Sequence, residues 1–135
     1  MNVSFQKIVE DQPHDIADAE VPWKDIVYED GNLIVYHDGY PVTPGHLLYV
    51  PKYNTVISLT NATSCAIIKG TEMVESKQWE GFNLGINIGT AAGQTVGWPH
   101  VHLIPRRTGD MEDPSGGVRH VIPERGNYKK GDHYA

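Results

Sequence analysis

Two histidines in the last third of the chain are placed to do chemistry together. His100 and His102 are two residues apart in the segment 99–104, where apolar residues alternate with them. Because successive side chains of a β-strand point to opposite faces, we expect both imidazoles on one face of a strand. Three interpretations compete: two filler histidines of the core or surface, two ligands of a metal ion that still needs a third, or a nucleophile with a partner that manages protons.

The loop before these histidines favours the third interpretation. Residues 89–95 read Gly-Thr-Ala-Ala-Gly-Gln-Thr, so a turn between two glycines is followed by an amide and a hydroxyl. Glycines let backbone N–H groups approach phosphate oxygens closely, and the side chains of Gln94 and Thr95 can donate to the same oxygens. With His100 and His102 close behind it, the loop suggests phosphoryl or nucleotidyl chemistry.

The strands that must hold these residues follow from β-branched and aromatic runs. Two such runs, 25–29 and 32–37, flank Asp30-Gly31, a dipeptide typical of a tight hairpin turn. A buried strand over 46–50 is stopped by Pro51, and two more strands are expected over 82–88 and 99–104.

One helix is expected over residues 59–78, where apolar side chains recur at steps of three and four. Thr60 or Asn61 is its expected N-cap, Gly70 weakens its middle, and Gly81 ends it. Several strands in meander order around one main helix predict an α+β domain with a mostly antiparallel sheet of about five strands.

Two segments resemble the histidine triad (HIT) superfamily of nucleotide hydrolases and transferases. Residues 87–106 are similar to the family's Gly-Gln-Thr/Ser-Val loop and the alternating histidines after it, and residues 36–52 look like its strand, Pro-Gly-His turn and next strand. Residues 116–123 also look like the C-terminal segment of bacterial members. The resemblance covers about residues 25–107, in the family's order with the predicted helix between the two blocks, and it implies a HIT-like fold.

The resemblance implies which histidine attacks. Counted from Gln94, the family's first histidine position holds Trp98, the middle one His100 and the third His102. The middle histidine is the family's nucleophile and needs from the first position mainly a backbone carbonyl to accept its Nδ1–H, which Trp98 still supplies. The implied mechanism is attack by His100 Nε2 on an α-phosphorus, a nucleotidyl-histidine intermediate, and hydrolysis by water, with His102 bonding the leaving oxygen.

The resemblance also implies binding roles. Asp38 would accept hydrogen bonds from ribose hydroxyls, Asn87 would contact the phosphate region, and His46 would lie near the histidine cluster. By residue type alone, the three are equally a turn-capping carboxylate, a loop amide and a histidine bonded to backbone at a strand start. The side chain of Trp98 is expected at the entrance to the site. The expected substrate-binding set is Asp38, His46, Asn87, Gln94, Thr95 and Trp98.

Composition and charge exclude several classes of protein. The chain has 135 residues, 39% of them hydrophobic, and a formal net charge of −6, which argues against a protein that wraps a nucleic-acid backbone. No apolar run is long enough for a membrane span, and no secretion signal is apparent. Cys65 is the single cysteine, so neither an internal disulfide nor the Cys-x-x-Cys zinc site of some HIT proteins can form. We expect a cytoplasmic protein without a metal ligand set or cofactor, although Mg²⁺ can accompany a polyphosphate substrate.

The sequence divides into an N-terminal arm or short helix (1–24), a HIT-like catalytic domain (25–107) and a C-terminal extended tail (108–135). The resemblance implies a homodimer that hydrolyses a dinucleoside polyphosphate or another nucleoside phosphate derivative, such as a phosphoramidate, at the α-phosphate. Two alternatives stay open. One is a nucleotide-binding sensor or adaptor with weak or no turnover, and the other is a nucleotidyl transferase.

Overall fold

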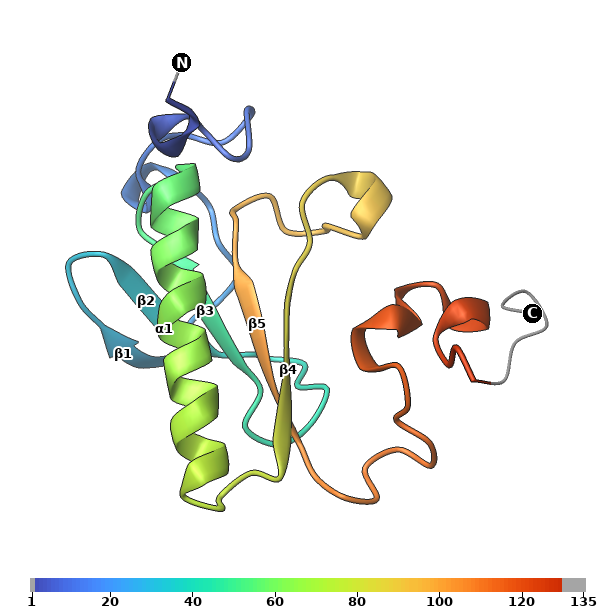
Figure 1. Cartoon of the computed structure of the whole chain (residues 1–135). Coiled ribbons are helices and arrows are strands. Elements are labelled where there is room, and N and C mark those ends of the chain that lie inside the picture. The colour runs from blue at the N-terminus through green and yellow to red at the C-terminus, as the bar shows by residue number, and fades with distance from the viewer. Residues whose placement is uncertain (1, 130–135) are drawn as a thin grey trace.

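The centre of the computed structural model, which describes residues 2–129, is a five-stranded antiparallel sheet crossed by one long helix (Figure 1). The strand order is β1-β2-β3-β5-β4, and each neighbouring pair is antiparallel. The expected fold class is confirmed. The strands are β1 (Ile26–Glu29), β2 (Leu33–His37), β3 (Leu47–Pro51), β4 (Gly81–Ile86) and β5 (Val101–Arg106), and the helix is α1 (Val56–Glu75).

The hairpin between β1 and β2 forms where the sequence predicts it. The Asp30 carboxylate closes the turn, because its Oδ1 accepts hydrogen bonds from the N–H groups of Asn32 (2.7 Å) and Leu33 (3.0 Å). An Asp side chain that bonds backbone two and three residues ahead stabilises a tight turn. The turn thereby sets the register in which Glu29 pairs with Ile34.

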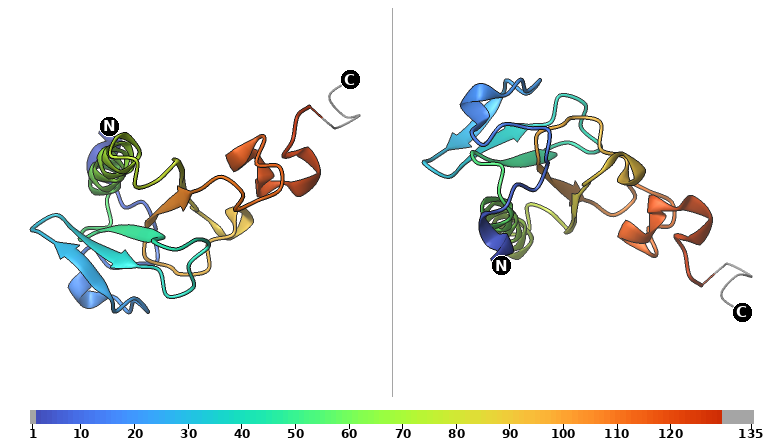
Figure 2. Two further views of the ribbon diagram at one scale, coloured as in Figure 1. Left: turned by 90° about the horizontal axis from the view of Figure 1, so that it is seen from below. Right: turned by 90° about the horizontal axis from the view of Figure 1, so that it is seen from above.

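The sheet is covered on both faces. One face of β2 and β3 packs under α1, in a cluster that includes Leu33, Val35 and Leu103. The opposite face carries a second cluster, around Tyr36, Leu48 and Trp98, which the N-terminal segment covers. Figure 2 shows α1 on one side of the sheet with the first turn of the chain (residues 3–5) beside it, while the later part of the N-terminal segment (residues 16–23) crosses to the other side. The candidate site lies on this second face.

The helix begins and ends earlier than the sequence suggests. Its N-cap is Thr55, whose Oγ1 accepts from the Ser58 N–H at 3.2 Å, and not Thr60 or Asn61, which lie inside the helix. The helix ends at Glu75, and Lys77 adopts the left-handed conformation there (φ 64°). The expected role of Gly81 is therefore wrong, because this residue opens β4. Within residues 2–129 no helix is long and apolar enough to cross a membrane.

The chain segments outside the sheet and helix are loops that contain short 3₁₀ turns. The N-terminal segment contains η1 (Val3–Phe5) and η2 (Ile16–Asp18). The C-terminal segment contains η4 (Gly117–Val121) and η5 (Pro123–Arg125), so it is not simply extended, and it stands off the sheet beside β4 and β5 (Figure 1).

The side chain of Asn54 anchors the N-terminal segment. It is fully buried, its Oδ1 accepts from the N–H groups of Ile8 and Val9, and its Nδ2 donates to the carbonyl of Val9 at 2.7 Å. A buried amide with all these partners satisfies backbone groups that no sheet or helix pairs. It therefore fixes the segment that covers the site face.

Gly70 in the middle of α1 allows the helix to approach β4, and this generates a stability prediction. A Cβ at this position would lie 2.8 Å from Cδ1 of Phe82. We expect Gly70→Ala to destabilise the protein by about 1–3 kcal/mol through overpacking, against a gain of about 1 kcal/mol in helix propensity. Chemical denaturation measures this difference in the free energy of unfolding. Ser64→Ala, at an exposed position of the same helix, is the matched control and should be neutral or slightly stabilising; a Gly70→Ala protein more stable than wild type would contradict the packing.

Candidate active site

His100 is held by a backbone hydrogen bond at the start of β5. Its Nδ1 lies 2.8 Å from the carbonyl oxygen of Trp98, and only 8% of the residue is exposed. A carbonyl only accepts, so Nδ1 carries the proton and the neutral ring keeps its lone pair on Nε2. The ring is therefore in the tautomer that a nucleophile needs, which is the one that the resemblance implies.

Trp98 supplies that carbonyl, but its side chain is not at the entrance to the site. The indole is fully buried in the second core cluster, and its Nε1–H donates to the carbonyl of Pro51 at 2.9 Å. The expectation that the indole lines the entrance and contacts substrate is wrong. A large apolar ring at this position is better placed in the core, where it gains far more from burial than it would at a wet entrance.

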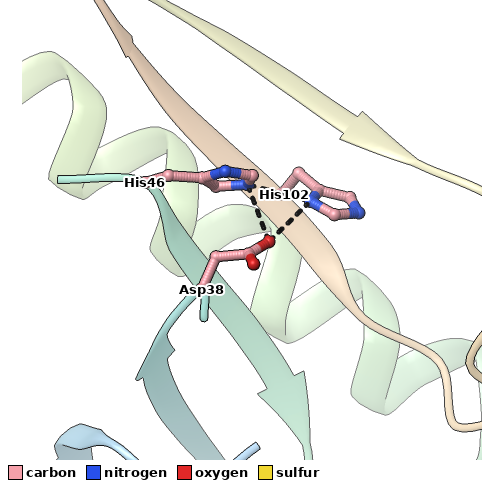
Figure 3. A group of neighbouring side chains, drawn as sticks. All are labelled: Asp38, His46 and His102. Carbon is pink, nitrogen blue, oxygen red and sulfur yellow. Dashed lines mark hydrogen bonds and ion pairs between the residues drawn. The ribbon is translucent and has the colours of Figure 1, made fainter. Parts of the chain in front are cut away.

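Asp38, His46 and His102 meet on the same face of the sheet (Figure 3). Asp38 follows β2, His46 precedes β3 and His102 lies on β5, so antiparallel pairing brings three distant segments together. His46 Nε2 is 2.9 Å from His102 Nδ1 and 3.4 Å from Asp38 Oδ2. The His102 ring also packs edge-on against His100, with centroids 5.0 Å apart, so the two imidazoles share a face as expected.

Hydrogen bonds fix the proton positions in this cluster. The backbone N–H of Val42 donates to His46 Nδ1 at 3.1 Å, so the proton of neutral His46 must be on Nε2. That N–H points at His102 Nδ1, which accepts it. Neutral His102 then carries its own proton on Nε2, the nitrogen on the side away from His46 (Figure 3). The site thus presents one lone pair, on His100, and one donor, on His102.

Burial keeps these rings neutral. Desolvation lowers the pKa of His100, although the bond to the Trp98 carbonyl and the charge of Asp38 oppose it. Desolvation, followed by repulsion from His100 and His46, lowers the pKa of His102 to about 4. His46 is 3% exposed, and desolvation lowers its pKa as well. A neutral imidazole is the form that attacks phosphorus, so these shifts favour nucleophilic chemistry.

The same three residues have the composition of a metal site. One ligand atom each from Asp38, His46 and His102 lies within 4.8 Å of the others. A metal needs an imidazole lone pair, but the bond from Val42 places a proton on His46 Nε2. Moving that proton to Nδ1 would set it against the Val42 N–H. The arrangement therefore fits a hydrogen-bonded cluster and does not fit a metal ligand set.

The glycine-bracketed loop is built around Gln94. Its Oε1 accepts from the Gly89 N–H at 2.8 Å, and its Nε2 donates to the carbonyls of Val96 and Gly97 at 3.1 Å each. Both amide hydrogens are engaged, so the expectation that this side chain donates to phosphate does not match the structure. Gln94 shapes the loop instead, with Gly89 and Gly93 at φ 91°, where glycine is favoured.

Other groups of the loop can take the phosphate-binding role. Thr95 and Val96 line the cavity beside His100, and within residues 2–129 their backbone N–H groups and the Thr95 hydroxyl bond to no protein acceptor. Asn87 lines the same cavity from the end of β4. Successive unpaired N–H groups beside a nucleophile form an anion-binding concavity.

The cavity has a volume of about 660 Å³ and contains a wall residue that the sequence did not reveal as part of the site. Trp23 lies against the nucleophile, with its ring centroid 4.8 Å from that of His100 and 5.7 Å from that of Tyr36. The sequence around Trp23 gives no sign of this contact, since nothing in its neighbours links it to a strand some 75 residues away. Its place after Val21-Pro22, on the arm that covers the site face, is the one signal that could have found it.

The remaining described histidines lie outside the histidine cluster. His37 borders the cavity from β2, but the residue is exposed and its Nδ1 is 3.9 Å from Asp25 Oδ2. His14 is exposed and stacks on Tyr53. The Nε2 of His120 lies 2.9 Å from the carbonyl oxygen of Ser115 in the C-terminal segment. His133 lies outside the described residues.

Comparisons with known proteins agree with this fold. The HIT domain matches residues 19–109. An uncharacterized HIT-like protein of Methanocaldococcus jannaschii is 37% identical over 103 residues, which cover 72% of this chain and 79% of that protein. The AP-4-A phosphorylase of Mycobacterium tuberculosis is 35% identical over 95 residues, covering 63% of this chain and 48% of the phosphorylase.

A solved structure gives the same result. A Zn-bound histidine triad family protein of Mycobacterium smegmatis superposes with a TM-score of 0.59 at 31% identity, covering 65% of this chain and 69% of that one. The HIT domain match, residues 19–109, spans all five strands and α1 as well as His100 and His102. The chain belongs to the HIT domain family.

Proposed function

We propose that the protein is a nucleotide hydrolase that cleaves a dinucleoside polyphosphate or another nucleoside phosphate derivative at the α-phosphate. The observation that carries this proposal is the orientation of His100, whose free Nε2 lone pair borders a cavity of about 660 Å³ beside the donor of His102. A relative named as an AP-4-A phosphorylase supports a nucleotide substrate. Binding and orienting such a substrate requires a concave site with few convergent polar groups, as this one has.

The proposed reaction has two steps. His100 Nε2 attacks the α-phosphorus while its Nδ1–H stays bonded to the Trp98 carbonyl, and a nucleotidyl-histidine forms. The N–H groups of Thr95 and Val96 donate hydrogen bonds to the non-bridging oxygens and stabilise the negative charge that develops on them. Water then attacks the phosphorus, the imidazole departs, and a nucleoside monophosphate is released. We propose Asp38 as the acceptor for the ribose hydroxyls and Asn87 as a phosphate contact, both lining the cavity.

Other parts of the interpretation stay proposals as well. Trp98 occupies the family's first histidine position and acts there through its carbonyl. Residues 25–107 form the catalytic unit, the protein works in the cytoplasm, and it binds no nucleic acid and inserts into no membrane. No protein ligand for a metal takes part in the covalent step, while Mg²⁺ can accompany a polyphosphate.

Substitution of His100 tests the nucleophile. Incubated with diadenosine polyphosphates and with an adenosine phosphoramidate, the wild-type protein should release AMP from at least one of them, and His100→Ala should lose at least about 10³-fold in that rate because no second lone pair replaces Nε2. Intact-mass measurement of acid-quenched protein should show a nucleotidyl adduct in wild type only. His14→Ala, at an exposed histidine away from the cavity, is the matched control and should keep full activity.

Each other outcome of that assay selects an alternative. Tight nucleotide binding without AMP release would indicate the sensor or adaptor. Release that appears only when an acceptor such as a sugar phosphate is added would indicate the transferase. Full activity in His100→Ala would remove the nucleophile assignment.

The lowered pKa of His100 predicts the pH dependence of adduct formation. Because burial lowers that pKa, the ring stays unprotonated somewhat below pH 6.5, and the single-turnover rate should stay level down to that pH and fall only below it. Trp23→Ala admits water to the His100 ring, so the acid limb of the pH–rate profile should move to higher pH. Trp23→Phe keeps the ring covered and should leave the acid limb at the same pH. An acid limb at or above pH 6.5 in wild type would contradict the role of burial.

We also propose a homodimer. β4 forms an edge of the sheet, and the C-terminal segment exposes Val118, Val121 and Ile122. Sedimentation equilibrium should give twice the chain mass of 15.0 kDa, and Val121→Asp should shift the distribution toward monomer while the exposed Glu124→Gln does not. A monomer at every concentration would disprove the dimer.

A further inference from the structure

His102 is locked as a donor that cannot easily take a second proton. Its Nδ1 already accepts from His46 Nε2–H at 2.9 Å, and His46 Nδ1 in turn accepts from the Val42 N–H at 3.1 Å. A proton added to His102 Nδ1 would face the His46 N–H. Shifting the proton of His46 to Nδ1 would set it against the Val42 N–H, so an imidazolium costs a hydrogen bond in either case.

The charged and titratable groups around His102 do not compensate for that cost. Among residues 2–129, Asp38 is the one anion beside it, but its Oδ2 is 3.9 Å from His102 Nδ1, and its Oδ1 already accepts from the Tyr40 N–H at 2.8 Å. His46 and His100 pack against the ring from β3 and from the start of β5, and both oppose its protonation. Desolvation acts in the same direction and is the largest cause of a pKa of about 4 for His102. At neutral pH the ring stabilises a leaving atom by a hydrogen bond and keeps its proton.

We infer that the site selects nucleoside monophosphate derivatives whose leaving group is an acid that departs as a stable anion, a carboxylate, sulfate or phosphate, over those whose leaving group is an alcohol or an amine. This inference rests on the proposed function and narrows its substrate class to anhydrides. An alkoxide or amide anion is too basic to leave without a full proton, and His102 is not in a state to give one. The anion of an acid needs only the hydrogen bond.

The step balances without a general acid. The lone pair of His100 Nε2 forms a bond to the α-phosphorus, the bond from phosphorus to the bridging oxygen breaks, and its electron pair leaves on that oxygen. The oxygen accepts a hydrogen bond from His102 Nε2–H, and the proton stays on His102. The positive charge on the substituted His100 ring is stabilised by the hydrogen bond from its Nδ1–H to the Trp98 carbonyl oxygen. In the second step water gives its oxygen to phosphorus and its proton to solvent, and His100 recovers its lone pair.

A second hollow offers room for the departing acid. It has a volume of about 420 Å³, shares Asp38, Asn87 and His102 with the main cavity, and extends past His102 to Val42 and Ile104. No Lys or Arg is among its lining residues within the described chain. Because Asp38 is acidic and no cation of the described chain offsets it there, a leaving group with one charge and an apolar body, such as a carboxylate, meets less repulsion in this hollow than a polyphosphate would.

A series of AMP derivatives that each carry one aromatic ring tests the inference, because size is matched and the acidity of the leaving group varies. The series comprises the mixed anhydride with benzoic acid, the 4-nitrophenyl ester, the phenyl ester and the N-benzyl phosphoramidate. Single-turnover formation of the His100 adduct is measured for each at pH 7, and the reference is the same series reacting with free imidazole, which offers no positioned acid. We expect the ratio of the anhydride rate to the phenyl ester rate to match the imidazole reference within about tenfold.

A ratio smaller than the reference by about 10²–10⁴-fold, the contribution typical of a positioned proton donor, would overturn the inference while leaving the proposed function intact. So would a phosphoramidate that reacts as fast as the anhydride. No adduct with any derivative would overturn the proposed function and this inference with it.

A substitution at Val42 tests directly whether the tautomer of His46 sets the selectivity. Val42→Pro removes the N–H that fixes the tautomer of His46, which frees His102 to accept a proton, so the anhydride-to-ester ratio should fall several-fold relative to wild type. Val42→Ala keeps the N–H at a residue that is 69% exposed and should leave the ratio unchanged. An unchanged ratio in a folded Val42→Pro protein would show that the tautomer of His46 does not set the selectivity; if that variant does not fold, the wild-type series still decides.

Discussion

The chemistry of this site depends on one hydrogen bond, from His100 Nδ1–H to the carbonyl oxygen of Trp98. It fixes the tautomer, and so decides that Nε2 is the nitrogen with a lone pair. It also fixes the orientation, because donor and acceptor are two residues apart on a segment that leads straight into β5. Without this bond a buried histidine would be free to present an N–H to the substrate and would not attack it.

Because the acceptor is a backbone group, the side chain at position 98 is free to take another role. Here it is a tryptophan that fills the core under the site and donates to the Pro51 carbonyl. Backbone also fixes the second imidazole pair, since the Val42 N–H decides the tautomer of His46 and thereby that of His102. Two main-chain groups therefore give neighbouring histidines opposite tautomers, one a nucleophile and the other a donor. Burial by Trp23 and the core keeps both neutral.

Local sequence patterns predicted much of this arrangement, because they depend on local geometry. The alternation of residues 100–104 placed His100 and His102 on one face, and Asp30-Gly31 marked the hairpin. The resemblance to HIT proteins supplied the approach of Asp38 and His46, which lie 56 or more residues from His102. The start of α1 was missed because Thr55 and Thr60 are equally good caps by residue type, so the residue types alone do not choose between them.

The parts that the sequence could not supply depend on contacts between distant segments. Trp23 reaches His100 only because the N-terminal arm crosses the sheet and is pinned by Asn54. Gln94 has the right chemistry to bind phosphate, but its amide is consumed by the loop that it shapes. The position of Trp98 suggested an entrance residue, and its burial followed from the neighbouring strands. The type of a residue limits the interactions that it can make, and its contacts in the folded protein determine which of those interactions it makes.

The tautomers of the three histidines are the most direct test of this account. Long-range ¹H–¹⁵N NMR correlation spectra at pH 8 distinguish the protonated from the unprotonated nitrogen of each ring. The account predicts a proton on Nδ1 of His100 and on Nε2 of both His46 and His102. A proton on Nε2 of His100, or on Nδ1 of His102, would contradict it.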